Sequence, residues 1–290
     1  MATPLPPNPF SNLTISHEAF SKCLDLERRR EQAQQDGRLS ALICARLLGY
    51  LLLEAPVETG RDKIALKIMQ CVDDASLQVL REMYKDHLIR CCQHQSEMGI
   101  DAAYLVQLIR LPSTPSSWNT MEKKLQTSRS HIYLGNSSMR QATKASSIQT
   151  IFGEYGGLDA TELSNVHDLR NIVSVGSRLF RPFTHLQVWL ERDPADPPNV
   201  YKLAAVIPQY LNGVLERIEF TTPDSLTLPV PDARYLAVHT ACARSAHFSG
   251  AAEYIRRILY RMEETDVLPT DGSSDVLYTA LIRRLDVEAH

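Results

Sequence analysis

The sequence predicts an α+β fold, in which mainly helical N- and C-terminal parts surround a small core and a short antiparallel sheet. Apolar residues recur at helical spacing on both sides of the centre, over residues 16–111 and 233–264. Residues 186–220 instead alternate between apolar and polar side chains, as strands do. We therefore divide the chain into an extended arm (1–15), an N-terminal helical region (16–111), a core region (112–220) and a C-terminal helical region (221–290).

The composition is that of an ordinary globular protein. The 290 residues carry a net charge of −3, so the chain as a whole does not require a polyanionic partner. The first ten residues lack the basic start and apolar run of a secretory signal, and their prolines favour an extended arm. The longest apolar run, 47–53, is far shorter than a membrane span. We expect an intracellular protein, cytoplasmic or nuclear, without a membrane partner, and the sequence identifies no protein partner.

The N-terminal helical region is predicted to contain four helices. Ser16 is the expected cap of the first, and the others are expected over 41–52, 60–71 and 75–95. The charged run Glu27–Glu31 mixes signs at spacings of three and four, which favours a solvated helix face over a nucleic-acid-binding patch. Cysteines stand at positions 23, 44, 71, 91, 92 and 242. Without a CxxC pair, they are predicted to be reduced core thiols.

The middle of the chain is predicted to contain two short helices and the strands. Gly156-Gly157 is expected to end a helix that starts near Ser147, and a second helix is expected over 177–186. Pro182 must then lie in the first turns of that helix or kink it. Strands are predicted over 186–190, 201–206 and 214–220, with a turn at 193–198 between the first two.

The C-terminal region returns to helical periodicity. Asp232 is a plausible cap for a helix over 233–248, and Gly250 separates it from a second helix over 251–264. His239 and His247 are eight residues apart and lie on roughly the same side of the first helix. They could face a cleft, and packing against neighbouring helices explains them equally well.

One segment of the chain is locally basic. Five cations stand against a single acid, Glu122, and they are Lys123, Lys124, Arg129, Arg140 and Lys144. The segment is interpreted as a flexible solvated loop, as a phosphate-binding surface, or as both, because phosphate contacts need only accessible cations. Any DNA contact is expected here.

Three positions could take part in the hydrolysis of a phosphodiester bond. Alternation in Ser130–Tyr133 places the ring of His131 on the face opposite Ile132, where it could activate water. Asn171 ends a His-x-x-x-Asn step, and Phe180 follows nine residues later. At Phe180 an aromatic ring offers no lone pair to a hard cation, so this position cannot supply a metal ligand.

The chain resembles fungal proteins in which helices flank an HNH nuclease domain. The resemblance covers most of the chain and is carried by Ala45–Pro56, Gly60-Arg61, Ser130–Tyr133, His167–Asn171, Phe183–Trp189, Phe220–Asp224, Tyr235–Arg244 and Ala246–Ile255. It implies a ββα-metal core that holds a divalent cation (Mg, Mn or Zn) and cleaves DNA. By this resemblance His131 is the general base and Asn171 the asparagine of the motif.

The sequence departs from this family at the metal site. Phe180 stands in place of the metal-binding His, and Thr184 stands where an Asp is usual. The segment before His131 is too short for the basic helix and first hairpin strand of the family, so the core is expected to be truncated. His167 and His185 are the remaining candidate ligands, but on a helix His185 would lie about 140° around the axis from Phe180.

The sequence therefore predicts an HNH nuclease-like protein whose catalysis is impaired or lost. The alternative is a non-catalytic module of helices that binds a protein partner or nucleic acid.

Overall fold

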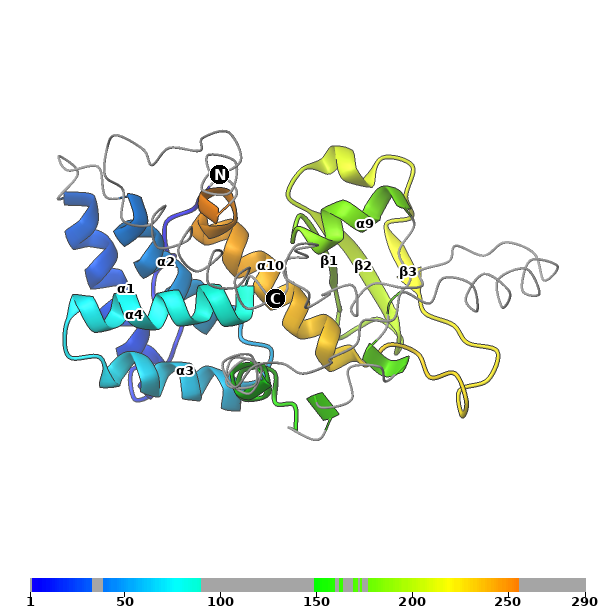
Figure 1. Ribbon diagram of the computed structural model, residues 1–290, viewed down its shortest axis with the longest axis horizontal. Helices are drawn as coiled ribbons and strands as arrows, with labels where there is room; N and C mark the ends of the chain where they lie inside the picture. Colours follow the sequence, from blue (N-terminus) through cyan, green and yellow to red (C-terminus); the bar gives the residue numbers. More distant parts are fainter. Residues whose placement is uncertain are drawn as a thin grey trace, which may run out of the picture.

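The computed structural model describes residues 2–32, 39–89, 149–159, 162–163, 169–171, 173 and 177–255. Among these residues, helices gather on one side of the molecule and a three-stranded antiparallel sheet lies on the other. The long helix α10 (Ala233–Ser249) runs between the two sides (Figure 1). This arrangement confirms the predicted α+β class. The hairpin expected around His131 lies outside the described residues.

The N-terminal helices form a block around α2. They are α1 (Ile15–Gln32), α2 (Leu39–Leu53), α3 (Glu58–Gln70) and α4 (Asp74–Tyr84), which continues into the π-helical turn η2 (Lys85–Ile89). Residues 43–52 of α2 are all buried. A helix that is buried all round belongs at the centre of a core, whereas the sequence had suggested an apolar stripe on one face.

The cap of α1 differs from the predicted one. The Thr14 hydroxyl accepts a hydrogen bond from the His17 N–H at 3.2 Å, so Thr14 caps the helix. Ser16 lies inside the helix, is buried, and donates its hydroxyl to Asp62 of α3 at 3.2 Å. Ser16, the predicted cap, therefore connects α1 to α3 instead.

The sheet region follows the predicted order of elements. It contains α9 (Ser177–Thr184), β1 (Val188–Glu191), β2 (Val200–Ala205), the 3-10 helix η6 (Pro208–Leu211) and β3 (Arg217–Glu219). The strands pair antiparallel in the order β1-β2-β3, with Val188 opposite Ala205 and Tyr201 opposite Ile218. The three predicted strands are confirmed; β1 and β3 are shorter than expected, and β2 has the expected length.

The predicted ends of α10 are confirmed. The Asp232 carboxylate accepts a hydrogen bond from the Arg234 N–H at 2.8 Å, which caps the helix. Gly250 ends it with a φ of +81°, a left-handed conformation that glycine adopts without steric cost. Helical backbone resumes over 251–255.

Two apolar cores lie on either side of α10. The larger one is centred on α2 and includes Ala241, Cys242 and Ala246 of α10. The smaller one fills the space between the sheet and α9, and Leu236 of α10 belongs to it. One helix therefore closes both cores.

The end of α9 has an unusual residue in the left-handed position. The Leu186 N–H donates to the Phe183 carbonyl at 3.0 Å and the Gln187 N–H donates to the Pro182 carbonyl at 2.7 Å. These two bonds form a Schellman motif, in which the left-handed residue is usually glycine. Here it is Leu186, with a φ of 59°, and its side chain is 1% exposed. The helix therefore ends at Thr184, two residues before the predicted end.

The N-terminal arm lies against the helices, and one acid of the charged run in α1 takes part in this contact. Glu27 is only 4% exposed and accepts the Leu5 N–H, at 3.1 and 3.2 Å from its two carboxylate oxygens. It also pairs with Arg46 of α2 at 2.5 Å. The arginines of the run that lie next to it, Arg28 and Arg29, are exposed as predicted, whereas Glu27 is buried between the arm and α2.

The cysteine prediction is confirmed where the structure describes it. Cys23, Cys44 and Cys242 are buried free thiols and Cys71 is a half-buried one. Cys91 and Cys92 lie outside the described residues. Of the helices that are described, none combines the length and the apolar character needed to cross a membrane.

Candidate functional site

Most of the residues that the sequence singled out lie outside the described residues. These are His131, His167, Lys123, Lys124, Arg129, Arg140 and Lys144. Asn171 is described: it ends the 3-10 helix η5 (Leu169–Asn171) and its side chain is half-buried. Phe180 lies in the middle of α9, where only its backbone is described. The structure therefore describes the surroundings of Asn171 and α9, and the rest of the predicted site stays a prediction.

The inner face of α9 packs against α10 through an aromatic pair. The Phe183 and His239 rings are stacked, with centroids 4.0 Å apart and planes within 6°. The His239 Nε2–H donates to the Phe183 carbonyl at 3.2 Å, and the imidazole is 2% exposed. Burial lowers the pKa of His239 to about 4, so the ring is neutral near pH 7. The packing explanation of His239 is the one that the structure supports.

The position at which the resemblance expects an Asp is also occupied by a packing residue. Thr184 is 2% exposed, and its hydroxyl donates to the Arg181 carbonyl at 3.1 Å within the same helix. His185 follows on the exposed side, with Nδ1 2.8 Å from the same carbonyl oxygen. The Thr184 hydroxyl and the His185 Nδ1 lie 3.4 Å apart and both contact the Arg181 carbonyl, so their polar atoms are engaged at the end of the helix.

The His, Cys, Asp and Glu side chains of the described residues do not form a metal site. Within the described ranges, no three His, Cys, Asp or Glu side chains come together as a cation site. Asn171 and His185 are the two predicted site residues with described side chains, and neither contributes to such a group.

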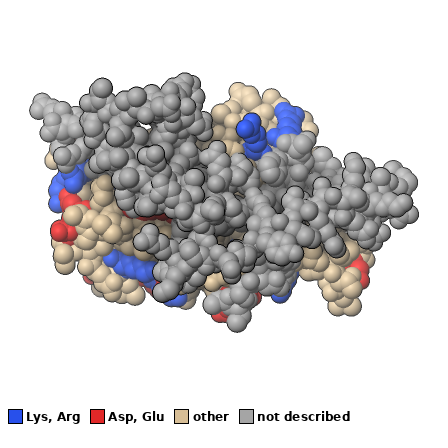
Figure 2. Space-filling view, in the orientation of Figure 1, with Lys and Arg blue, Asp and Glu red and all other residues tan. Residues whose placement is uncertain are grey.

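The outer face of α9 is basic. Arg178 and Arg181 are exposed, and neither forms an ion pair with another described residue. With His185, they follow a spacing of three and four residues, which places all three side chains on one side of the helix axis. Figure 2 shows Lys and Arg atoms over this part of the molecule, without neighbouring acidic atoms on the visible face. We call Arg178, Arg181 and His185 the basic face of α9.

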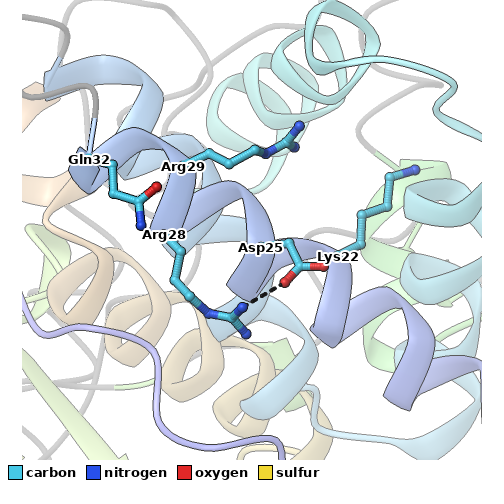
Figure 3. Close-up of a pocket in the computed structure, with 5 residues that line it drawn as sticks. All are labelled: Lys22, Asp25, Arg28, Arg29 and Gln32. Atoms are coloured by element: carbon cyan, nitrogen blue, oxygen red, sulfur yellow. Dashed lines mark ion pairs between the residues drawn. The ribbon is translucent and has the colours of Figure 1, made fainter.

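A hollow along α1 has a different character. Its lining, shown in Figure 3, consists of Lys22, Asp25, Arg28, Arg29 and Gln32. Arg28 pairs with Asp25 at 3.0 Å, and Arg29 pairs with an acid of α4 at 3.1 Å. Lys22 donates to the Ile68 carbonyl at 2.9 Å, near the C-terminus of α3, where a cation offsets the helix dipole. Each cation of the hollow therefore already has a partner in the protein.

An ion-pair network joins the helical block to the sheet. Arg244 of α10 binds Glu54 at 2.6 Å through Nε and Glu191 of β1 at 2.7 Å through Nη1. The indole N–H of Trp189 donates to the same Glu191 carboxylate at 2.9 Å. His247 packs between Trp189 and Phe248, and partial burial lowers its pKa. Nothing in the sequence pattern signalled this network, because its members are far apart in the chain.

Comparison of the chain with protein-family models, with curated proteins and with solved structures gave no match.

Proposed function

We propose that the protein is a non-catalytic relative of the HNH nucleases that binds nucleic acid. The observation that carries this proposal is that the two faces of α9 differ: one is buried and the other is exposed and basic. The inner face of the helix packs through Phe183 and Thr184, and its outer face presents arginines that form no ion pair with the part of the chain that the structure describes. An HNH helix would instead direct a metal ligand inward from the position of Phe180.

Loss of catalysis follows from the chemistry of these side chains. A phenyl ring cannot coordinate Mg²⁺, Mn²⁺ or Zn²⁺, and the Thr184 hydroxyl is bonded to its own helix. Even with His131 as general base and Asn171 beside it, the cation that activates water would lack its ligand on the helix. The proposed relation to HNH nucleases therefore depends on the sequence resemblance. The proposed loss of catalysis depends on the residues of α9.

The nucleic-acid contact is proposed for the basic face of α9 together with the basic segment from Lys123 to Lys144. Unpaired, exposed arginines bind phosphate without first breaking an intramolecular ion pair. The cations of the α1 hollow lack this advantage, because each of them is already engaged.

Binding to a labelled DNA duplex, followed by fluorescence anisotropy over about 50–200 mM salt, tests this proposal. We expect affinity to fall steeply with salt. The double variant Arg178→Glu/Arg181→Glu should bind at least about tenfold more weakly and lower the salt slope by about one for each lost contact. Arg28→Glu/Lys63→Glu, which makes the same charge change on other helices, is the matched control.

Plasmid cleavage in Mg²⁺ or Mn²⁺ tests the inactive centre separately. We expect none above the level of His131→Ala. Metal-dependent cutting that His131→Ala abolishes would show that the centre is active and would contradict the proposal.

A helical interaction module without a nucleic-acid role is the second candidate. The engaged cations of the α1 hollow favour it, since this surface offers phosphate no free charge. Absence of DNA binding even at about 50 mM salt would favour this candidate over the first.

A further inference from the structure

The N-terminal arm is bound through all the backbone donors that its central segment possesses. In Thr3-Pro4-Leu5-Pro6-Pro7, only Thr3 and Leu5 have an N–H, because proline has none. The Thr3 N–H donates to the Phe248 carbonyl of α10 at 2.7 Å, and the Leu5 N–H donates to the Glu27 carboxylate of α1 at 3.1 Å. The surface therefore offers one acceptor for each donor of the segment.

The same surface also donates to the arm. The Tyr50 hydroxyl of α2 lies 3.3 Å from the Thr3 carbonyl oxygen and 2.9 Å from that of Pro4. We call the surface formed by Glu27, Gly49, Tyr50 and Phe248 the arm groove. It spans three helices, α1, α2 and α10.

A single apolar side chain of the arm enters this groove. Leu5 is 8% exposed, while its neighbours Pro4, Pro6 and Pro7 are exposed. Leu5 fits because α2 has a glycine beneath it. A Cβ on Gly49 would lie 2.6 Å from the Leu5 Cδ2 atom, and its three nearest atoms would all belong to Leu5.

From this complementarity we propose that the arm groove is a binding site for an extended, proline-flanked leucine segment, x-Pro-Leu-Pro, and that the chain's own arm occupies it in cis. Prolines, and the residues before them, are restricted to extended conformations, so such a segment loses little conformational entropy on binding. The partner that fits is a proline-rich segment of another protein that replaces the arm.

The groove does not need the arm to satisfy its own polar groups. Glu27 remains paired with Arg46 at 2.5 Å, and Arg46 binds Glu31 at 2.9 Å. Departure of the arm would leave the Tyr50 hydroxyl and the Phe248 carbonyl to water. Exchange of the arm for another segment is therefore compatible with a folded helical block.

The test uses the full chain with Leu5→Asp, which removes the apolar anchor of the arm. A labelled peptide with the sequence of residues 2–10 is titrated with this variant and with the wild type, and binding is followed by fluorescence polarisation. We expect saturable binding to Leu5→Asp. Binding to the wild type should be at least about tenfold weaker, because the tethered arm competes at a high effective concentration.

Two controls locate the site. A peptide with Asp in place of its Leu, and the chain variant Leu5→Asp/Gly49→Ala, should each weaken binding at least about tenfold. Gly49→Ala is suitable because alanine is favoured over glycine inside a helix and the added methyl would meet only the bound leucine as its nearest neighbour.

Three results would overturn the proposal. The first is a folded Leu5→Asp chain that does not bind the peptide, or binds the Asp peptide equally well. The second is loss of the cooperative thermal transition in Leu5→Asp, which would make the arm a permanent part of the core. The third is a wild-type dimer that Leu5→Asp abolishes, which would assign the groove to the arm of a second copy.

Discussion

The two cores on either side of α10 differ in how much they depend on that helix. The helical block is built around α2, which α1, α3, α4 and α10 all contact, and α10 adds five buried residues to this core. The sheet, by contrast, has three short strands with α9 and η6, and it completes its core with Leu236 and the His239–Phe183 stack of α10. A disturbance of the N-terminal half of α10, at Leu236 or His239, should therefore weaken the sheet side first.

The polar groups buried in the two regions differ as well. The helical block contains a charged pair, Glu27–Arg46, whereas the sheet side contains a neutral imidazole, His239. Protonation of a buried imidazole as the pH falls costs stability, because the charged ring loses its hydration. The two regions should thus respond differently to truncation and to acid.

The largest expected effect is a cavity at the centre of the helical block. Leu48→Ala, at a fully buried position of α2, should lower the free energy of unfolding by about 3–5 kcal/mol. Leu203→Ala in β2 should cost about 2–3 kcal/mol, because the smaller core can collapse around the cavity. Urea denaturation measures both, with Leu13→Ala, at a 98% exposed position, as the control. Equal losses at Leu48 and Leu203 would contradict the difference between the cores.

Acid should act on the sheet side through His239. Its pKa in the folded protein is about 4, below the ordinary value of 6.5, so the unfolded chain binds the proton more tightly. The stability that this difference contributes is complete above about pH 6.5 and is lost as the pH falls towards 4, by about 3 kcal/mol in total.

His239→Phe keeps an aromatic ring against Phe183 and removes the titration. Its urea midpoint should change less between pH 4 and 6.5 than that of the wild type, and His185→Gln, at an exposed position, should behave as the wild type. An unchanged pH profile in His239→Phe would assign the acid sensitivity to other groups.

The link between the two regions should break at Arg244. Arg244→Leu would leave the Glu54 and Glu191 carboxylates close together without their shared cation, at a cost of about 2 kcal/mol. We expect the thermal transition to broaden or divide, because the sheet side would lose its connection to the helical block. A single sharp transition in Arg244→Leu, as in the control Arg178→Leu, would show that apolar contacts of α10 suffice.

The smallest effect should be the coupling between Leu5 and Gly49. Gly49→Ala in the Leu5→Ala background should stabilise the chain by about 0.5–1 kcal/mol, since alanine favours the helix and the clashing leucine atoms are gone. In the wild-type background the same change should stabilise less, or destabilise. A double-mutant cycle by urea denaturation gives this coupling directly, and additive effects would mean that Leu5 does not occupy the pocket in solution.

Local signals in the sequence predicted the elements, and long-range contacts account for what they missed. The Asp232 cap, the Gly250 end and the antiparallel strands depend on residues close in sequence, so they could be predicted. The burial of Glu27 depends on Leu5 and Arg46, which lie 22 and 19 residues away. A carboxylate with charged neighbours at helical spacing looks solvated until those partners are known.

The candidate site shows the same limit. Phe180 and Thr184 could be recognised in the sequence as departures from the metal site, because the residue type alone shows that a metal ligand is missing. The stacking of Phe183 on His239, 56 residues apart, requires the position of α10 relative to α9. The sequence did not indicate that the arginines of α9 share an exposed face. The helix is short and contains a proline, so it has too few residues for a helical pattern to be recognised.

Leu186 illustrates how opposing demands restrict a single position. Its left-handed backbone favours glycine by about 1 kcal/mol, and its buried side chain is worth about 1.5–3 kcal/mol to the core. Glycine would relax the backbone and empty the core, while valine or isoleucine would fill the core with a branched side chain that tolerates this φ even less. In a saturation mutagenesis of the chain, this codon should accept almost no replacement, although no chemistry takes place there.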